Sequence, residues 1–168
     1  MPITIYEIST PVFIRALGNL SSLLNKAEAF CTENELDPAA LIEARLAPDM
    51  FTLARQVQGA CDAAKAAIGR LAEVERPSFP DTEETFSELQ ERITKTVHFI
   101  EGVDREKFDG AANLVVTIRL RGGDMEMTGL KLLLQFALPN FYFHMTTAYD
   151  ILRHKGMQIG KMDYLGTF

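Results

Sequence analysis

Apolar residues recur at every third or fourth position in four long stretches of the chain, and this spacing places them on one face of a helix. The first helix is predicted to begin after Ser9, Thr10 and Pro11, because a capping residue followed by proline is a common helix start. It is expected to run to about Asn34. Its inward face is formed by Phe13, Leu17, Leu20, Leu24, Ala27 and Cys31, and is widened by Leu23 and Phe30.

A connector separates this helix from the second one. Asp37 and Pro38 predict a short helical turn that reaches Arg45, and the second long helix is expected to start after Met50. The inward positions of that helix are Ala54, Val57, Cys61, Ala64, Ile68 and Leu71. Most of these residues are small, so either the neighbouring backbones approach closely or a pocket is left beside them.

Two prolines, Pro77 and Pro80, end the second helix. The third helix is expected to start at Asp81 or Thr82, since the acidic residues that follow suit a helix N-terminus. Its core stripe consists of Phe86, Leu89, Ile93, Val97 and Ile100. Its solvent side is expected to carry Glu88, Glu91, Arg92 and Lys95.

Between residues 114 and 128 the helical spacing gives way to a β-rich sequence. Two strands, residues 114–120 and 125–128, are predicted to form a hairpin around a turn at residues 121–124, which contains two glycines. Glycine supplies the positive φ that a tight turn needs. Because an isolated hairpin is only marginally stable in water, we expect this one to lie against the helices or against a partner subunit.

The fourth long helix is predicted to start at Pro139 and Asn140, after the apolar run 130–138, and to end at Lys155 before the capping residue Gly156. Its inward face carries Phe141, His144, Ala148 and Ile151. The pattern as a whole predicts a mainly α protein. The predicted architecture is a four-helix bundle in a single domain, residues 1–168, with a small β-hairpin between helices three and four.

Composition and charge narrow the function classes. The net charge of −6 and the pI of about 5.1 argue against a nucleic-acid-binding protein, which needs a basic face. No apolar run is long enough to cross a bilayer, and residues 1–6 lack the features of a signal peptide, so we expect a cytoplasmic protein without a membrane segment. Cys31 and Cys61 fall on inward positions and are expected to be free thiols.

Several motifs carry a resemblance to a known group of proteins. They are Pro139-Asn140-Phe141-Tyr142-Phe143-His144, Ala148-Tyr149-Asp150-Ile151-Leu152-Arg153-His154-Lys155-Gly156 and Gly160-Lys161-Met162-Asp163, with Arg55-Gln56-Val57-Gln58 and Ala60-Cys61-Asp62 in the second helix. The chain resembles an uncharacterised family within the DinB-like (DinB/YfiT) superfamily over nearly its whole length.

This resemblance implies a DinB-like bundle with up-down-down-up helices, often assembled as a homodimer. It also implies a divalent metal, Zn²⁺ or Ni²⁺, bound by one histidine of helix two and a His-x-x-x-His pair of helix four. Some superfamily members are thiol-dependent transferases or isomerases. The motif places His144 at the second histidine of the pair and Asn140 at the first, and the second helix contains no histidine.

That departure weakens the metal hypothesis, because such a site needs about three imidazole, thiolate or carboxylate ligands. Our leading hypothesis is a protein of unknown function that binds a small apolar ligand, or a weak metal through His144, between helices two and four. The candidate ligand-binding residues are His144, Asn140, Tyr149, Gln58 and Asp62. The alternative is a non-catalytic structural or interaction protein, a dimer with a degenerate metal site, in which His144 is a hydrogen-bonded core residue.

Overall fold

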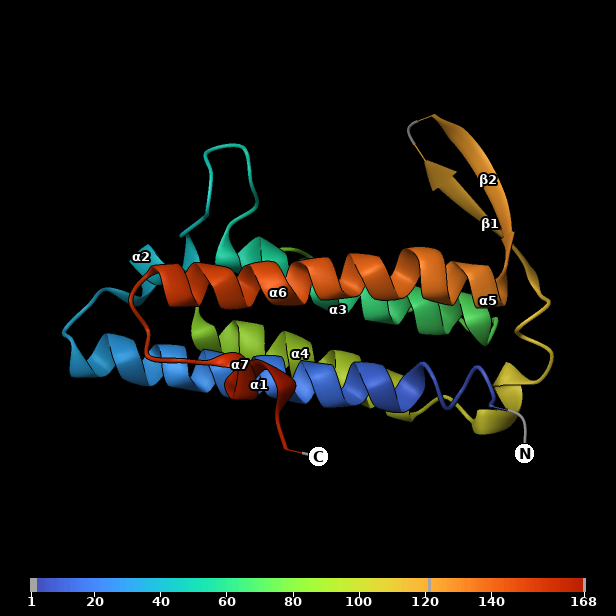
Figure 1. Ribbon diagram of the computed structural model, residues 1–168, viewed down its shortest axis with the longest axis horizontal. Coiled ribbons are helices and arrows are strands. Elements are labelled where there is room, and N and C mark those ends of the chain that lie inside the picture. The colour runs from blue at the N-terminus through green and yellow to red at the C-terminus, as the bar shows by residue number, and fades with distance from the viewer. Residues whose placement is uncertain (1–2, 121, 168) are drawn as a thin grey trace.

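Four long helices form the bundle in the computed structural model, which describes residues 3–120 and 122–167 (Figure 1). They are α1 (Thr10–Glu33), α3 (Leu53–Leu71), α4 (Phe86–Glu101) and α6 (Leu138–His154). The shorter elements are α2 (Pro38–Ile42), η1 (Arg105–Phe108), α5 (Gly129–Lys131), η2 (Leu132–Ala137), α7 (Lys161–Leu165), β1 (Val115–Leu120) and β2 (Gly123–Thr128). None of the described helices combines the length and the apolarity needed to span a membrane.

The predicted up-down-down-up order is confirmed. In Figure 1, α1 and α6 run in one direction, and α3 and α4 both run in the other. The connector 72–85 therefore has to travel back along the bundle, from the end of α3 to the start of α4. The most extensive packing in the bundle joins α3 to α6, and α4 packs against both α1 and α3.

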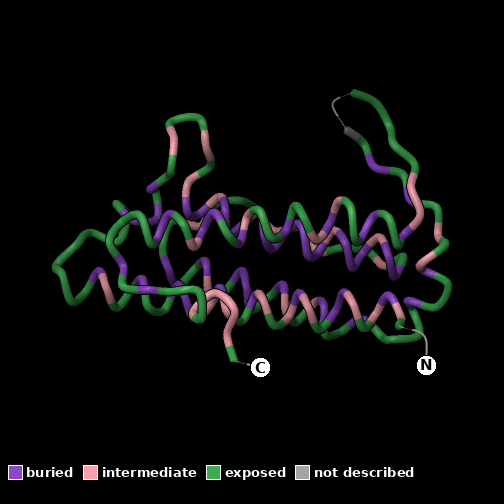
Figure 2. Tube along the Cα trace, viewed as in Figure 1, coloured by how far each residue is buried: buried purple, intermediate pink, exposed green. Residues whose placement is uncertain are grey.

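The inward faces predicted for the first three helices form the core. Figure 2 shows buried residues facing the interior of the bundle along all four long helices. All predicted inward positions of α1 and α3 are buried except Phe30, which packs against the core while partly exposed. On α4, Val97 is likewise partly buried, and the other four members of its stripe are buried. The helical period therefore identified most of the core correctly.

Helix α4 starts later than the predicted Asp81 or Thr82, because Thr85 caps it. The Thr85 hydroxyl accepts a hydrogen bond from the Glu88 amide at 3.2 Å, and the Glu88 carboxylate accepts one from the Thr85 amide at 2.9 Å. This reciprocal pair is a capping box. Arg92 also departs from the prediction, since it is buried rather than on the solvent side.

The last long helix starts ten residues earlier than predicted. Elements α5, η2 and α6 follow one another without a break from Gly129 onwards, and η2 is π-helical (Figure 1). Pro139 lies in the first turn of α6, directly after this π segment. A π segment changes the hydrogen-bond register of a helix, so the missing amide of Pro139 does not end the helix here.

The predicted hairpin is confirmed. Strands β1 and β2 pair antiparallel, with Val116 opposite Met127 and Ile118 opposite Met125, and they extend away from one end of the bundle (Figure 1). Val116 and Ile118 are buried, so one face of the hairpin is covered. Arg121, a member of the predicted turn, lies outside the described residues.

The C-terminal segment folds back over α1. The Asn19 side-chain amide donates hydrogen bonds to the backbone carbonyls of Tyr164 at 3.1 Å and Leu165 at 2.9 Å. Lys26 forms an ion pair with Asp163. These contacts hold α7 against α1.

Candidate functional site

A groove of about 240 Å³ lies between α3 and the continuous helix formed by η2 and α6. Helix α3 contributes Gly59, Asp62, Ala63, Ala66, Ala67 and Arg70, and the other side consists of Leu132, Phe136, Ala137, Asn140 and His144. Three alanines and a glycine on α3 leave this space open, because larger side chains there would fill it. The groove is therefore mainly apolar, with four polar side chains along it.

His144 is anchored by a residue that the sequence did not identify. Its Nδ1 lies 2.8 Å from the side-chain oxygen of Gln56, which is 1% exposed. The side-chain nitrogen of Gln56 donates to the backbone carbonyl of Phe51 at 3.5 Å, which orients the amide with its oxygen toward the histidine. An oxygen acceptor requires a proton on Nδ1. The neutral imidazole therefore carries its free lone pair on Nε2.

Two aromatic residues stand beside the imidazole. The ring of Phe51 is nearly parallel to it, with an interplanar angle of 7° and centroids 6.5 Å apart. The ring of Phe143 presents its edge, with centroids 5.6 Å apart. Both phenylalanines are exposed, Phe51 by 50% and Phe143 by 55%. His144 thus lies at the boundary between the groove and an apolar patch of surface.

Burial lowers the pKa of His144 below its ordinary value of 6.5, because a half-buried site disfavours the imidazolium. The negative charge of Asp62 acts in the opposite direction, and the positive charge of Arg55 adds to the lowering. With its pKa lowered, the imidazole is neutral at pH 7. It then offers Nε2 as a hydrogen-bond acceptor or as a weak base.

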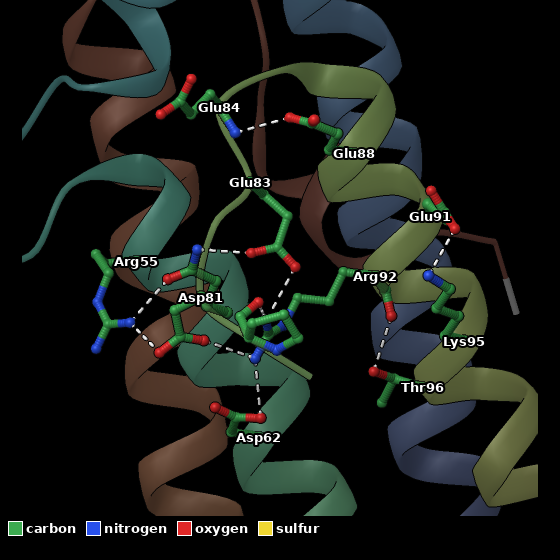
Figure 3. Close-up of polar contacts among 12 residues, drawn as sticks. Arg55, Asp62, Asp81, Glu83, Glu84, Glu88, Glu91, Arg92, Lys95 and Thr96 are labelled. Carbon is green, nitrogen blue, oxygen red and sulfur yellow. Dashed lines mark hydrogen bonds and ion pairs between the residues drawn. The ribbon is translucent and has the colours of Figure 1, made fainter. Parts of the chain in front are cut away.

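Asp62 lies at the junction of the groove and an ionic cluster on the neighbouring face of α3 (Figure 3). Its carboxylate accepts a hydrogen bond from Arg92 of α4 at 3.0 Å and forms an ion pair with Lys65 at 3.0 Å. Arg92 also pairs with Asp81 at 3.0 Å and with Glu83 at 2.9 Å. The charge of Asp62 is therefore already balanced within the protein.

The same cluster holds the connector 72–85 against the bundle. Besides its two carboxylates there, Arg92 donates to the backbone carbonyl of Pro80 at 3.2 Å. Arg55 bridges Asp81 to the side chain of Gln58, as the dashed lines of Figure 3 show for Asp81. Arg92 is 2% exposed, and its Nε has no hydrogen-bond partner among the described residues. One buried arginine thus fixes a long loop to two helices.

The five candidate residues from the sequence separate into two groups. His144, Asn140 and Asp62 line the same groove. Gln58 is buried on the side of the ionic cluster, where its amide donates to Glu83 at 2.8 Å. Tyr149 packs edge-on against Tyr164 of α7, with ring centroids 5.9 Å apart. The structure therefore brings three of the five together.

Sequence reasoning missed Gln56 and Arg70. Gln56 lies one position from the inward residue Val57. The spacing of apolar residues does not predict that a polar side chain at this position is buried. Its burial becomes evident only once His144, 88 positions later, is in contact with it. Arg70 stands in the last turn of α3, where a basic residue is ordinarily explained by the helix dipole.

The donor set does not fit a metal site of the superfamily type. Within residues 3–120 and 122–167, no three His, Cys, Asp or Glu residues are grouped so as to hold a metal ion. In the groove, one imidazole is accompanied by the amide of Asn140 and by a carboxylate that two cations already bind. Transition metals need more anionic or imidazole ligands than these residues supply.

Comparison with known proteins agrees with this architecture. The chain matches a family described as a domain of unknown function, DUF1993, over residues 5–165. It is similar to the crystal structure of a DinB family member protein from Shewanella denitrificans, with 40% sequence identity and a TM-score of 0.91. That similarity covers 97% of this chain and 92% of the other. The chain matches none of the curated proteins.

The expected relationship is therefore confirmed at the level of family and fold. The helix order and the hairpin before the last helix accompany a family match that spans almost the whole chain. This chain belongs to the DUF1993 family and has the helical fold of a DinB family member.

Proposed function

We propose that this protein binds a small, mainly apolar molecule in the groove between α3 and α6, and that His144 accepts a hydrogen bond from it. The observation that carries the proposal is the state of this imidazole. Its Nδ1 is anchored by Gln56, and its Nε2 has no hydrogen-bond partner among the described residues. A half-buried acceptor beside an apolar groove is the kind of polar contact that orients ligands in small-molecule sites.

The apolar lining supports the same proposal. Ala63, Ala66 and Ala67 form one wall, and Leu132 and Phe136 contribute to the other. A hydrocarbon ligand placed there removes apolar surface from water on both sides. Each buried methylene contributes about 0.8 kcal/mol. Apolar contact then supplies most of the affinity, and the hydrogen bond to His144 selects molecules that carry a donor at the right end.

The test uses a simple uncharged probe, 1,8-octanediol, followed by two-dimensional NMR of the labelled protein. We expect shifts at the amides of Ala63 and Ala66 and at Nε2 of His144. His144→Ala is expected to weaken binding about fivefold, the effect of about 1 kcal/mol for a hydrogen bond. His98→Ala is the matched control, since His98 is exposed on α4. Unchanged affinity in His144→Ala contradicts the proposal.

A second candidate function is a non-catalytic interaction protein, in which this face joins two subunits of a homodimer. The observation that favours it is the exposure of Phe51 and Phe143 beside His144, since neighbouring exposed aromatics often mark contact surfaces. Sedimentation of the wild type and of Phe143→Ser tests it. If the wild type is dimeric and the variant monomeric, while 1,8-octanediol does not bind, this second function replaces the first.

A further inference from the structure

Arg70 stands at the opposite end of the groove from His144. Gly59, Ala63, Ala66 and Arg70 follow one another at spacings of three or four and line the same groove, so they share one face of α3. The imidazole of His144 lies over Gly59, at the first of these four positions. Eleven residues of α-helix separate Gly59 from Arg70, a rise of roughly 16 Å. The groove is therefore an elongated channel with a histidine at one end and an arginine at the other.

The guanidinium of Arg70 lacks a carboxylate partner in the part of the chain that the structure describes. Its hydrogen bond is a long one, 3.4 Å, to the backbone carbonyl of Ala66 in its own helix. A second guanidinium is close by. The side chain of Arg76 folds over Gly69, with its Cγ 2.2 Å from where a β-carbon on that glycine would stand. Neither arginine takes part in an ion pair among the described residues.

The contrast with the neighbouring ionic cluster is informative. There, Arg55, Lys65 and Arg92 are matched by Asp62, Asp81 and Glu83, so each cation has a carboxylate. At the far end of the groove, two cations stand without such a match. Partial burial and the positive charge of Arg76 lower the pKa of Arg70, as expected for a cation that lacks a counter-charge. The negative charge of an anion bound there would offset both effects by favouring the charged guanidinium.

We propose that the groove binds a linear amphipathic carboxylate, whose acid group pairs with Arg70 and whose far end donates a hydrogen bond to His144. The proposal rests on the function proposed above and names its ligand class. A guanidinium presents two parallel N–H donors that match a carboxylate. The chain of the ligand would cover Ala63 and Ala66, and Arg76 would add positive charge beside the acid group.

Three probes of equal chain length separate the two ends of the ligand: 8-hydroxyoctanoate, octanoate and 1,8-octanediol. Titration calorimetry of the wild type is expected to give the tightest binding for 8-hydroxyoctanoate, about tenfold tighter than for the diol. Arg70→Gln should weaken binding of both acids about tenfold and leave the diol unchanged. Arg70→Lys keeps the positive charge but lacks the two parallel N–H donors, and should weaken binding of the acids by an intermediate factor.

Arg119→Gln is the matched control, because Arg119 is exposed on the hairpin and does not line the groove. If the diol binds as tightly as the acids and Arg70→Gln alters neither, the acid-binding proposal is overturned while the proposed function survives. If both acids bind through Arg70 while His144→Ala weakens neither 8-hydroxyoctanoate nor the diol, the pairing with Arg70 stands, and the hydrogen bond to His144 is refuted both here and in the proposed function. A lower melting temperature in Arg70→Gln with unchanged binding assigns Arg70 to the helix C-terminus and overturns the proposal.

Discussion

The imidazole ring of His144 lies directly against the α-carbon of Gly59. A β-carbon at this glycine would stand 2.7 Å from Cε1, 2.8 Å from Nδ1 and 2.9 Å from Nε2 of the ring. Real β-carbons do not approach other atoms so closely, so only glycine lets the histidine reach Gln56. A glycine within a helix costs about 1 kcal/mol relative to alanine. Helix α3 has this destabilising glycine at the position against which the His144 ring packs.

Gly59→Ala is therefore expected to destabilise the protein although alanine is the better helix former. The added methyl displaces the ring and breaks its hydrogen bond to Gln56, at a cost of about 2–3 kcal/mol that exceeds the gain in helix propensity. We expect a net loss of about 1–2 kcal/mol in urea unfolding, together with weaker binding of 1,8-octanediol. Gly18→Ala on α1 is the control, since a β-carbon there meets nothing within 4 Å. A stabilised Gly59→Ala would contradict this account.

Arg92→Met is expected to lower the free energy of unfolding by about 2–4 kcal/mol. Removing one partner of a buried ionic cluster leaves its carboxylates without compensation. Breaking a fully buried ion pair costs about 3–5 kcal/mol. The loss expected here is smaller because the side chains of Asp62 and Asp81 are 48% and 36% exposed. Lys95→Met serves for comparison: Lys95 pairs with Glu91 on the exposed face of the same helix, and such pairs contribute less than about 1 kcal/mol. Equal losses in the two variants would refute the role of Arg92.

Stability should fall on mild acidification because of His144. Its pKa is lowered in the folded protein, so as the pH falls the unfolded chain takes up a proton first, near 6.5, and is favoured. The free energy of unfolding should therefore be constant above about pH 7.5 and decrease below pH 6.5 until the folded pKa is passed. The free energies of unfolding of the wild type and of His144→Gln, measured between pH 5 and 8, test this pH dependence. Parallel curves for the two proteins would exclude His144 as the source.

Both thiols should be unreactive in the folded protein. Burial raises the pKa of Cys61 to about 12, and this side chain is fully buried. Burial also raises the pKa of Cys31, which is 1% exposed. The thiolate is the reactive form, so a chromogenic disulfide reagent at pH 8 should label neither cysteine until denaturant is added. Rapid labelling of one thiol in the native protein would show that its surroundings open.

The fold was largely predictable because each helix buries one face, and a buried face leaves a periodic trace in the sequence. The exceptions are polar residues whose burial depends on distant partners. Arg92 has the spacing of a solvent-exposed residue, and it is buried because the connector 72–85 supplies Asp81 and Glu83. Gln56 is buried because His144 arrives from a remote helix. Both contacts join residues that are not neighbours on one helix, so the spacing of apolar residues within a helix cannot predict them.

The start of the last helix was missed for a different reason. Proline ordinarily marks a helix boundary, so the sequence predicts a helix start at Pro139. The π-helical segment η2 changes the hydrogen-bond register before the proline, and the helix runs on from Gly129. A β-carbon on Gly129 would stand 2.0 Å from the backbone carbonyl oxygen of Ala111, so this helix start is fixed by a close backbone approach that no sequence period reveals.

The groove also provides a means of finding its natural occupant. Its two walls come from α3 and from η2 with α6, and Gln56 and His144, which join them, are 88 positions apart in the chain. An unfolded chain cannot hold these walls together, so a molecule that fits between them binds the native state alone. By mass action such a molecule adds about 2.7 kcal/mol to the free energy of unfolding when its concentration is one hundred times its dissociation constant. The melting temperature rises accordingly. Thermal unfolding in the presence of candidate metabolites can therefore identify the ligand without any assay of its chemistry.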